Sequence, residues 1–332
     1  MTPLAPHLTA FLRERLPKER SASPHTCDAY AYAFQLLLSF AAKRLRTGPS
    51  ALVVEQLDAP LVLAFLDELE SKRGNSARTR NARLAAIKSF ARFLAYRVPS
   101  AAQQIESLLA IPIKKTDERL VAYLDRGEMQ AVLDAPDPHS RDGIRDRAML
   151  HLGFAAGLRV SELVGLRTDE LVLRPEPAIV VRGKGRRERV LPLWKTTSKA
   201  VRAWLAIRGE APCPELFLNA RGGPLTRDGF AHILAKHVAV ATQKAPSLAR
   251  KHVSPHVLRH SCAMQTLEAT HDVRKVALWL GHASVQTTEI YLRADPSAKL
   301  ETINGMLPPK LRRGRFRAPD KLLASLKAPR TR

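Results

Sequence analysis

The 332-residue sequence has few cysteines and no long hydrophobic run. Its three cysteines are odd in number and none belongs to a Cys-x-x-Cys pair, which argues against a disulfide framework and a zinc site. No apolar run reaches the ~18 residues that a membrane helix needs. The first residues also lack the charged-then-apolar order of a signal peptide. We therefore expect a protein of the reducing cytoplasm, neither exported nor held in a membrane.

Aromatic and acidic residues are scarce as well. Aromatics make up 5% of the chain, so its cores must be built mainly from Leu, Ala and Val. Lysine and arginine number 54 against 31 acidic residues, a net charge of +23. Such an excess favours binding to a polyanion, with DNA or RNA as the default partner. Composition alone leaves a ribosome-associated or membrane-surface basic protein open, and the length favours two domains.

The first third of the sequence predicts a bundle of helices. Apolar residues recur at helical spacing over residues 8–16, 26–44, 59–72, 77–96 and 101–109. Asp58 and Ser76 are suitable N-caps for two of these helices. The side of helix 77–96 opposite its apolar face is basic, and it could lie on DNA phosphates or be an ordinary solvated face. The residues that we expect to contact DNA there are Arg78, Arg80, Arg83 and Lys88.

A short, basic segment at residues 113–118 follows Pro112 and predicts a linker. Beyond it we expect helices at residues 125–133, 141–156, 197–207, 228–242, 255–269, 272–280, 284–292 and 296–306, with Ser161 capping a further short helix. Strands are expected at 178–181, 189–193 and 215–218. Residues 307–332 are basic and rich in proline, which favours a flexible tail. The predicted fold class is mostly α with a small antiparallel sheet (α+β).

Side chains suited to phosphate chemistry gather in the second half of the sequence. His256 and Arg259 are three residues apart, so a helix would place them on one face. Gly281-His282 and then Tyr291 follow, and a tyrosine hydroxyl can act as a nucleophile. A tyrosine surrounded by arginines and histidines suits an anionic, tetrahedral, oxygen-rich target such as a phosphodiester. Each residue alone could equally be structural.

Four segments together resemble the tyrosine recombinases, also called the phage-integrase family, which include the Xer-type enzymes. They are Ala156–Leu163 with Arg159, Arg182–Arg187 with Lys184, the box His256-x-x-Arg259-His260, and Leu280-Gly281-His282 followed by Tyr291. Their order matches that of the family. The resemblance implies a helical, SAM-like core-binding domain at residues 1–112 and a catalytic domain at residues 119–306.

The resemblance also implies roles for individual residues. Tyr291 would be the nucleophile that forms a 3′-phosphotyrosine, and Arg159 and Arg259 would bind the non-bridging oxygens. Lys184 would protonate the leaving 5′ oxygen. His256 would assist proton transfer at the nucleophile or donate to a non-bridging oxygen, and His282 would donate a hydrogen bond to the phosphate. The residues implied around them are Glu162 and His260, which would support the catalytic groups, and Arg186 and Arg187, which would contact DNA; no cofactor or metal ion is implied.

The function implied is site-specific recombination of double-stranded DNA through a Holliday junction, with the protein acting as dimers that pair into a tetramer. A second recombinase could take part. Chromosome-dimer resolution, integration, excision and transposition by a mobile element all fit the pattern, and we expect a cytoplasmic, nucleoid-associated protein. Two alternatives stay open: a nicking-closing enzyme like a type IB topoisomerase, and a non-catalytic DNA-binding accessory protein.

Overall fold

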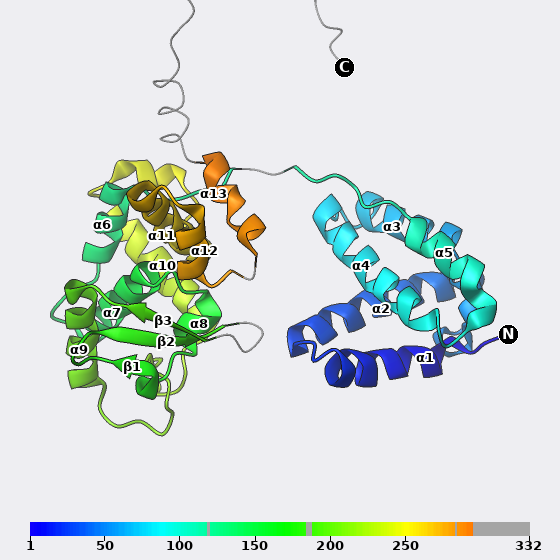
Figure 1. Cartoon of the computed structure of the whole chain (residues 1–332), viewed down its shortest axis with the longest axis horizontal. Coiled ribbons are helices and arrows are strands. Elements are labelled where there is room, and N and C mark those ends of the chain that lie inside the picture. The colour runs from blue at the N-terminus through cyan, green and yellow to red at the C-terminus, as the bar shows by residue number, and fades with distance from the viewer. Residues whose placement is uncertain (118–119, 184–187, 283, 295–332) are drawn as a thin grey trace, which may run out of the picture. The chain divides into compact units, whose positions relative to one another are not determined.

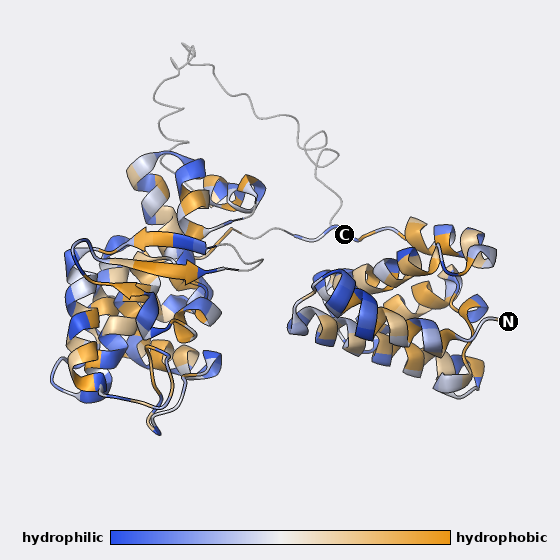
Figure 2. Ribbon diagram, turned by 60° about the horizontal axis from the view of Figure 1, so that its bottom comes forward, coloured by the Kyte–Doolittle hydropathy of each residue, from blue (hydrophilic) through white to orange (hydrophobic). Residues whose placement is uncertain are grey.

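The computed structural model describes residues 1–117, 120–183, 188–282 and 284–294. The chain divides into two compact units, Met1–Glu118 and Arg119–Arg332 (Figure 1). Hydrophilic and hydrophobic stretches alternate along the helices of both units (Figure 2). Within the described residues, no helix is long and apolar enough to cross a membrane. The helix predicted at 296–306 and the tail at 307–332 lie outside these residues.

The first unit is helical, as the sequence predicts. Its helices are α1 Leu4–Ala10, which continues into the π-helical turn η1 Phe11–Glu19, α2 Pro24–Leu45, α3 Ala59–Ser71, α4 Ala77–Leu94 and α5 Ala102–Ala110. The Asp58 carboxylate accepts the Leu61 N–H, and the Ser76 hydroxyl accepts the Thr79 N–H, so both predicted N-caps are confirmed. Three short 3-10 turns complete the unit: η2 Pro49–Ala51, η3 Val54–Gln56 and η4 Pro99–Ala101.

One residue of the expected DNA-contacting set is buried. Arg80 is 4% exposed and donates to the Pro112 carbonyl at 3.0 Å, with its Nε 3.9 Å from a Glu70 carboxylate oxygen. The prediction that Arg80 contacts DNA is therefore wrong. Arg80 lies four and seven residues before Leu84 and Ile87, so it shares their buried face of α4. It ties α4 to the segment that follows α5.

The other basic residues of α4 are more accessible. Arg78 is exposed. Arg83 is half-buried, donates to a backbone carbonyl of α2 and lies over the Tyr32 ring at 4.9 Å. Lys88 donates to the Leu109 carbonyl at 2.7 Å, and its pKa is lowered because burial disfavours the charged ammonium. Of this set, Arg78 is the residue best placed to meet a phosphate.

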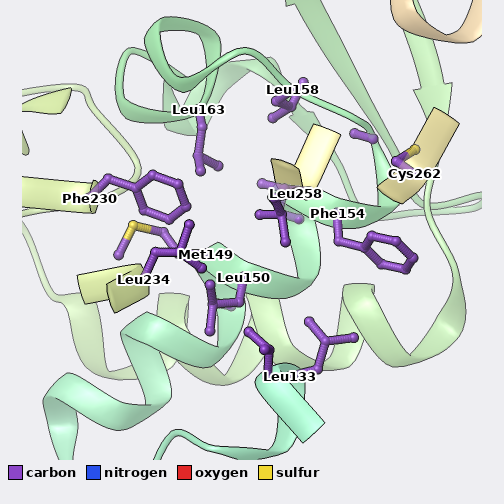
Figure 3. Packing of buried hydrophobic residues seen from close by; sticks show 14 of the residues in the cluster. Leu133, Met149, Leu150, Phe154, Leu158, Leu163, Phe230, Leu234, Leu258 and Cys262 are labelled. Carbon is purple, nitrogen blue, oxygen red and sulfur yellow. The ribbon is translucent and has the colours of Figure 1, made fainter. Parts of the chain in front are cut away.

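The second unit packs one face of a small antiparallel sheet against helices, because buried and more exposed residues alternate along β2 and β3. The sheet has the order β1-β2-β3, and Val180 pairs with Val190 at the centre of the β2–β3 hairpin. Met149 and Leu150 lie at the centre of the core, packed among residues of α8, α10 and α11 (Figure 3). The elements are α6 Arg126–Asp134, α7 Arg141–Ala155, α8 Val160–Val164, β1 Leu171–Val172, β2 Ala178–Arg182, β3 Glu188–Pro192, α9 Lys195–Arg208, α10 Arg227–Ala241, α11 Pro255–Thr270, α12 Val273–Leu280 and α13 Glu289–Ala294, with 3-10 turns η5 Thr168–Glu170, η6 Pro246–Arg250 and η7 Val285–Thr287.

Three local predictions for this unit are wrong. The third strand is Leu171–Val172 rather than 215–218, where Glu215 and Leu218 form only isolated bridges. Leu216 and Phe217 are adjacent and both fully buried, so this segment lacks the alternation of a half-buried strand. Helix α8 begins at Val160, so Ser161 lies inside it and is not its N-cap. The helix expected at 284–292 is divided into η7 and α13.

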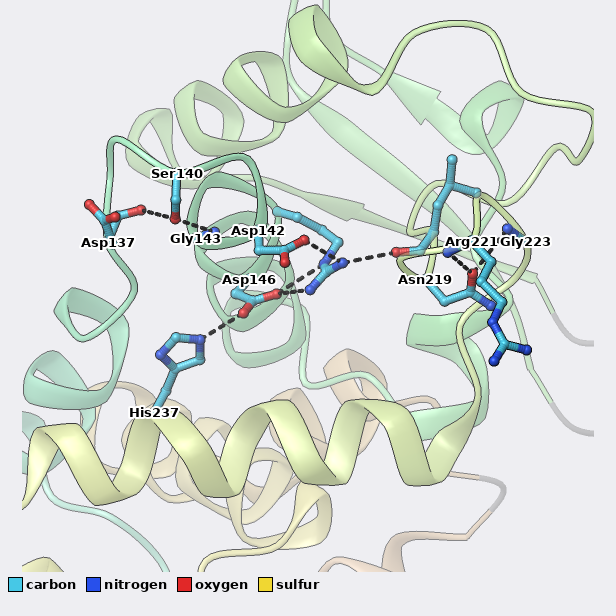
Figure 4. A network of polar contacts seen from close by, with 11 residues as sticks. Asp137, Ser140, Asp142, Gly143, Asp146, Asn219, Arg221, Gly223 and His237 are labelled. Atoms are coloured by element: carbon cyan, nitrogen blue, oxygen red, sulfur yellow. Dashed lines mark hydrogen bonds and ion pairs between the residues drawn. The ribbon is translucent and has the colours of Figure 1, made fainter.

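A buried ionic network fixes α7 to α10 (Figure 4). Both Asp146 oxygens are used: one accepts from Arg145 at 2.8 and 3.0 Å, and the other bonds to His237 Nε2 at 2.8 Å. Arg145 also donates to the Leu218 carbonyl at 3.3 Å. Burial raises the pKa of Asp146, but the hydrogen bonds from His237 and Arg145 outweigh it and hold the pKa below its usual value. The carboxylate is therefore ionised at neutral pH.

Replacing Asp146 with asparagine is expected to destabilise the second unit by about 3 kcal/mol, because the buried Arg145 cation loses its buried counter-charge. Urea unfolding followed by circular dichroism measures this free energy. The matched control is Asp169→Asn, since Asp169 also pairs with an arginine but its side chain is 65% exposed. A loss for Asp146→Asn no greater than that of the control would contradict the prediction.

Candidate active site

Gly157 brings the Arg159 segment against the helices that carry the other predicted site residues. It follows α7 with a φ of +56°. A Cβ at this position would lie 2.6 Å from a Leu280 methyl carbon and 3.0 Å from the Cys262 sulfur. Only glycine permits both the left-handed conformation and this close approach. The turn therefore places Arg159, at the N-cap of α8, beside α11 and the end of α12.

Arg259 joins these segments from the middle of α11. Its side chain is 5% exposed and donates to the carbonyls of Gly157 and Leu280, the latter at 2.8 Å. Burial, with the nearby charge of Arg159, lowers the pKa of Arg259 to about 10. It is still protonated at neutral pH. A buried cation is thus held next to a second arginine, and the closest carboxylate oxygen in the ion pairs of Arg259, on Glu162, is 3.9 Å away.

Glu162 is shared between three arginines. Its side chain is 6% exposed and accepts from Arg159 through the backbone N–H at 2.9 Å and through Nη1 at 2.7 Å. Arg189, on β3, donates to both oxygens of the same carboxylate, at 2.8 and 3.3 Å. Burial raises the pKa of Glu162, but these hydrogen bonds outweigh it and lower the pKa below its usual value. We call Arg159, Glu162, Arg189 and Arg259 the arginine cluster.

Tyr291 lies on α13 and is 1% exposed, packed in a small cluster with residues of α11 and α12. Its hydroxyl is 3.0 Å from His260 Nδ1, and the two rings meet edge to face. Burial raises the pKa of Tyr291 to about 12, although Arg259 and Arg159 act in the opposite direction. Burial, with His256 and Arg259 nearby, lowers the pKa of His260 to about 4. At pH 7 the imidazole is neutral, and one ring nitrogen can accept a proton.

His282 follows the end of α12, which terminates at Gly281 in the left-handed conformation with a φ of +64°. His282 Nδ1 lies 2.7 Å from the hydroxyl of the fully buried Thr288, and the Thr288 carbonyl accepts the Tyr291 N–H at 3.0 Å. Burial, with Arg259 nearby, lowers the pKa of His282 to about 4. One threonine therefore links the His282 turn to the helix that carries the tyrosine.

The structure brings together most of the site residues expected from the sequence. Arg159, Glu162 and Arg259 lie in one cluster, and Tyr291 interacts electrostatically with both arginines. His256 is exposed on α11, with its ring 6.5 Å from that of His260. The histidine at the tyrosine hydroxyl is thus His260, which the sequence suggested only as a supporting residue. Lys184, Arg186 and Arg187 lie outside the described residues.

Arg189 and Thr288 are the polar residues of the site that the sequence did not single out. Strand alternation gives a signal for Arg189, because it shares a side of β3 with the buried Leu191. An arginine on an inward side requires a buried acceptor, and Glu162 provides it. Thr288 has no comparable signal, since its role depends on the break between η7 and α13.

Comparison with known proteins assigns both units. Residues 122–298 match the model of the phage integrase family, and residues 8–97 match the phage integrase N-terminal SAM-like domain. The chain belongs to the phage integrase family. It is an enzyme of the tyrosine-recombinase type, which cuts and rejoins DNA, and the predicted family and fold class are confirmed.

Curated relatives extend over almost the whole chain. Integrase/recombinase y4rC of Sinorhizobium fredii is 44% identical over 97% of this chain and 97% of its own length. Tyrosine recombinase XerC of Pelobacter propionicus is 36% identical over 93% of this chain and 97% of its own length. Among solved structures, the XerH recombinase in a post-cleavage complex with its difH substrate has a TM-score of 0.65 at 21% identity, covering 90% of this chain and 84% of that one.

Proposed function

We propose that the protein is a site-specific recombinase in which Tyr291 attacks a DNA phosphodiester within the arginine cluster. The observation that supports this is the meeting of Arg159 and Arg259, one hundred residues apart in sequence, beside the tyrosine helix. Arg159 keeps N–H groups that are not committed to Glu162, and each terminal nitrogen of Arg259 donates one N–H to a backbone carbonyl and keeps a second. A planar guanidinium binds two phosphate oxygens at once. Fixed donors of this kind stabilise the charge that develops on the pentavalent phosphorane.

The reaction is a displacement at phosphorus. The Tyr291 oxygen forms a bond to the phosphorus atom as the bond to the 5′ oxygen breaks, which gives a 3′-phosphotyrosine and a free 5′ hydroxyl. The tyrosine proton passes to a histidine: His260 lies at the hydroxyl here, and His256 lies one turn away on α11. Lys184 gives a proton to the leaving oxygen. The phosphotyrosine conserves the bond energy, so resealing needs no ATP.

Access to the tyrosine requires movement of α13. The hydroxyl is buried against His260, so a DNA phosphate cannot reach it in the described conformation. Helix α13 has six residues and packs on α11, α12 and η7. We infer that DNA binding draws Tyr291 out of this buried position and towards the two arginines, with the histidines of α11 still in reach of its hydroxyl and His282 donating to the same phosphate.

The assembly proposed is two dimers on two DNA sites, exchanging one pair of strands at a time through a Holliday junction. Residues 1–112 would bind DNA through Arg78 and the neighbouring basic surface, residues 113–118 would link the two domains, and residues 119–306 would carry the chemistry and, through Arg186 and Arg187, contact DNA beside Lys184. A second recombinase could share the synapse. The net charge of +23 supports a large DNA footprint and a location with the nucleoid in the cytoplasm.

A covalent trapping assay tests the function. The protein is incubated with nicked suicide duplexes taken from the DNA that flanks its gene, and a denaturing gel separates free from protein-linked strands. We expect a slow-migrating band whose linked strand carries the protein on its 3′ phosphate. Tight DNA binding without such a band on any flanking duplex would instead favour the accessory-protein alternative. Relaxation of supercoiled DNA by isolated monomers, without junctions, would favour the topoisomerase-like one.

A further inference from the structure

Arg189 makes close contacts in the arginine cluster but has no role in the reaction described above. Its side chain is 12% exposed and grips Glu162 with two N–H groups, at 2.8 and 3.3 Å, one to each carboxylate oxygen. Glu162 is in turn the partner of Arg159, which it meets through a single guanidinium nitrogen at 2.7 Å. Arg189 therefore bonds to both oxygens of the carboxylate that also accepts from Arg159.

The charges of the arginine cluster indicate the effect of the contact between Arg189 and Glu162. Arg159 and Arg259 supply two positive charges for the phosphate, but Glu162 lies 2.7 Å from the first and 3.9 Å from the second. A carboxylate at these distances competes with a phosphate for the same guanidinium groups, most strongly where water is excluded. Arg189 adds a third positive charge, bonded to both oxygens of the same carboxylate, and offsets that competition.

We propose that Arg189 is a positioning residue that neutralises Glu162 and so leaves Arg159 and Arg259 free to bind the scissile phosphate. The inference rests on the proposed function. Without Arg189, both oxygens of Glu162 would turn to Arg159 in a bidentate pair, the geometry that Arg159 needs for phosphate. Phosphate could then bind only by breaking that pair.

A second contact extends the role of Arg189 to the His282 turn. A Cβ on Gly281 would lie 2.9 Å from Arg189 Nη1 and 3.0 Å from its Cδ, so the Arg189 side chain packs directly under this glycine. Gly281 has a φ of +64° and precedes His282. The same arginine thus contacts the turn that orients His282 and the carboxylate that orients Arg159.

Two other roles for Arg189 make different predictions. A purely structural ion pair would affect folding but would leave the reaction rate of the folded enzyme unchanged. A direct DNA contact would weaken DNA binding in parallel with the reaction rate, whether or not Glu162 carries a charge. Removing the charge of Glu162 distinguishes these roles from the proposed one. If Arg189 acts by neutralising Glu162, a neutral Glu162→Gln side chain should restore the cleavage rate that is lost with Arg189.

The experiment is a double-mutant cycle with Arg189→Gln, Glu162→Gln and the double variant. For each protein we would measure the melting temperature, the DNA dissociation constant and the single-turnover rate of covalent product formation on a suicide duplex. We expect Arg189→Gln to keep its DNA affinity within about threefold while its cleavage rate falls about 100-fold, the scale of losing one transition-state donor. The double variant should recover to within about tenfold of wild type.

Arg167→Gln is the matched control, because Arg167 also makes a two-nitrogen contact with a carboxylate, on Asp169, but outside the cluster. It should cleave at the wild-type rate. The proposal would be overturned if the fold-losses in cleavage rate of the two single variants multiply in the double variant. It would also be overturned if Arg189→Gln loses DNA affinity by the same factor as cleavage rate. If Arg189→Gln fails to fold, the double variant still tests the proposal. A neutralising role predicts that the double variant folds and cleaves DNA.

The proposed function can fail separately from this inference. If wild type and Arg167→Gln form no covalent product, the proposed function fails, and the melting temperatures still test the neutralisation. We expect Arg189→Gln to melt about 5 °C lower than wild type and the added Glu162→Gln change to restore most of that loss. An Arg189→Gln melting point that falls further when Glu162 is neutralised would overturn the inference.

Discussion

Tyr291→Phe is expected to eliminate the covalent protein–DNA product, a loss of at least about 10⁴-fold, while DNA affinity stays within about threefold of wild type. The phenyl ring fills the same buried space among α11 and α12, so packing is preserved. The change removes the oxygen that would bond to phosphorus and the hydrogen bond to His260. That histidine is half-buried and can shift its hydrogen bonding to water.

The measurement compares wild type, Tyr291→Phe and Tyr123→Phe on one suicide duplex, with binding followed by gel shift in the same buffer. Tyr123 is a suitable control because it packs against the same small cluster and loses the same hydroxyl group. We expect it to cleave normally. A protein-linked band from Tyr291→Phe would show that another side chain is the nucleophile and would remove the basis of the proposed site.

Most of the helices could be predicted because they depend on local sequence, and the candidate site residues could be proposed because they stand in short local motifs. Asp58 and Ser76 cap helices in the structure as in the prediction, since an oxygen at the N-cap and an N–H three residues later are sufficient. Arg159, Arg259 and Tyr291 stand in motifs that the family shares. The strand predicted at 215–218 failed because two adjacent core residues, Leu216 and Phe217, resemble a buried strand in composition.

The partners of charged residues could not be predicted, because they come from distant parts of the chain. Spacing places Arg80 among the basic residues of α4, but its side chain is buried and donates to the Pro112 carbonyl. Arg189 meets Glu162 only because the Gly157 turn delivers α8 to the side of β3. His260 meets Tyr291 because α13 folds back on α11. Each of these pairs depends on tertiary structure, which neither residue spacing nor helical periodicity specifies.

The substitution Arg259→Gln distinguishes the effect of the buried arginine on folding stability from its effect on DNA cleavage. In the wild-type protein the guanidinium is buried beside Arg159, and both burial and that like charge lower the pKa of Arg259 to about 10. Since the folded-state pKa lies below the ordinary value of an arginine, folding disfavours the charged form, and this cost is fully present at every pH below about 10. Arg259 therefore destabilises the protein in the absence of DNA, apart from its hydrogen bonds to Gly157 and Leu280.

We expect Arg259→Gln to lower the cleavage rate by about 10³-fold, because one of the two fixed cations at the phosphorane is lost. Glutamine can still donate to one of the two carbonyls, and the repulsion with Arg159 disappears, so the melting temperature without DNA should change by less than about 3 °C. Addition of target DNA should raise the melting temperature of wild type more than that of the variant, because at a given concentration a tighter-binding ligand stabilises the folded state more. Arg274→Gln, an exposed arginine on α12, is the control and should match wild type in both measurements. A large drop in melting temperature without DNA would show that Arg259 is retained for its two backbone hydrogen bonds rather than for the phosphate.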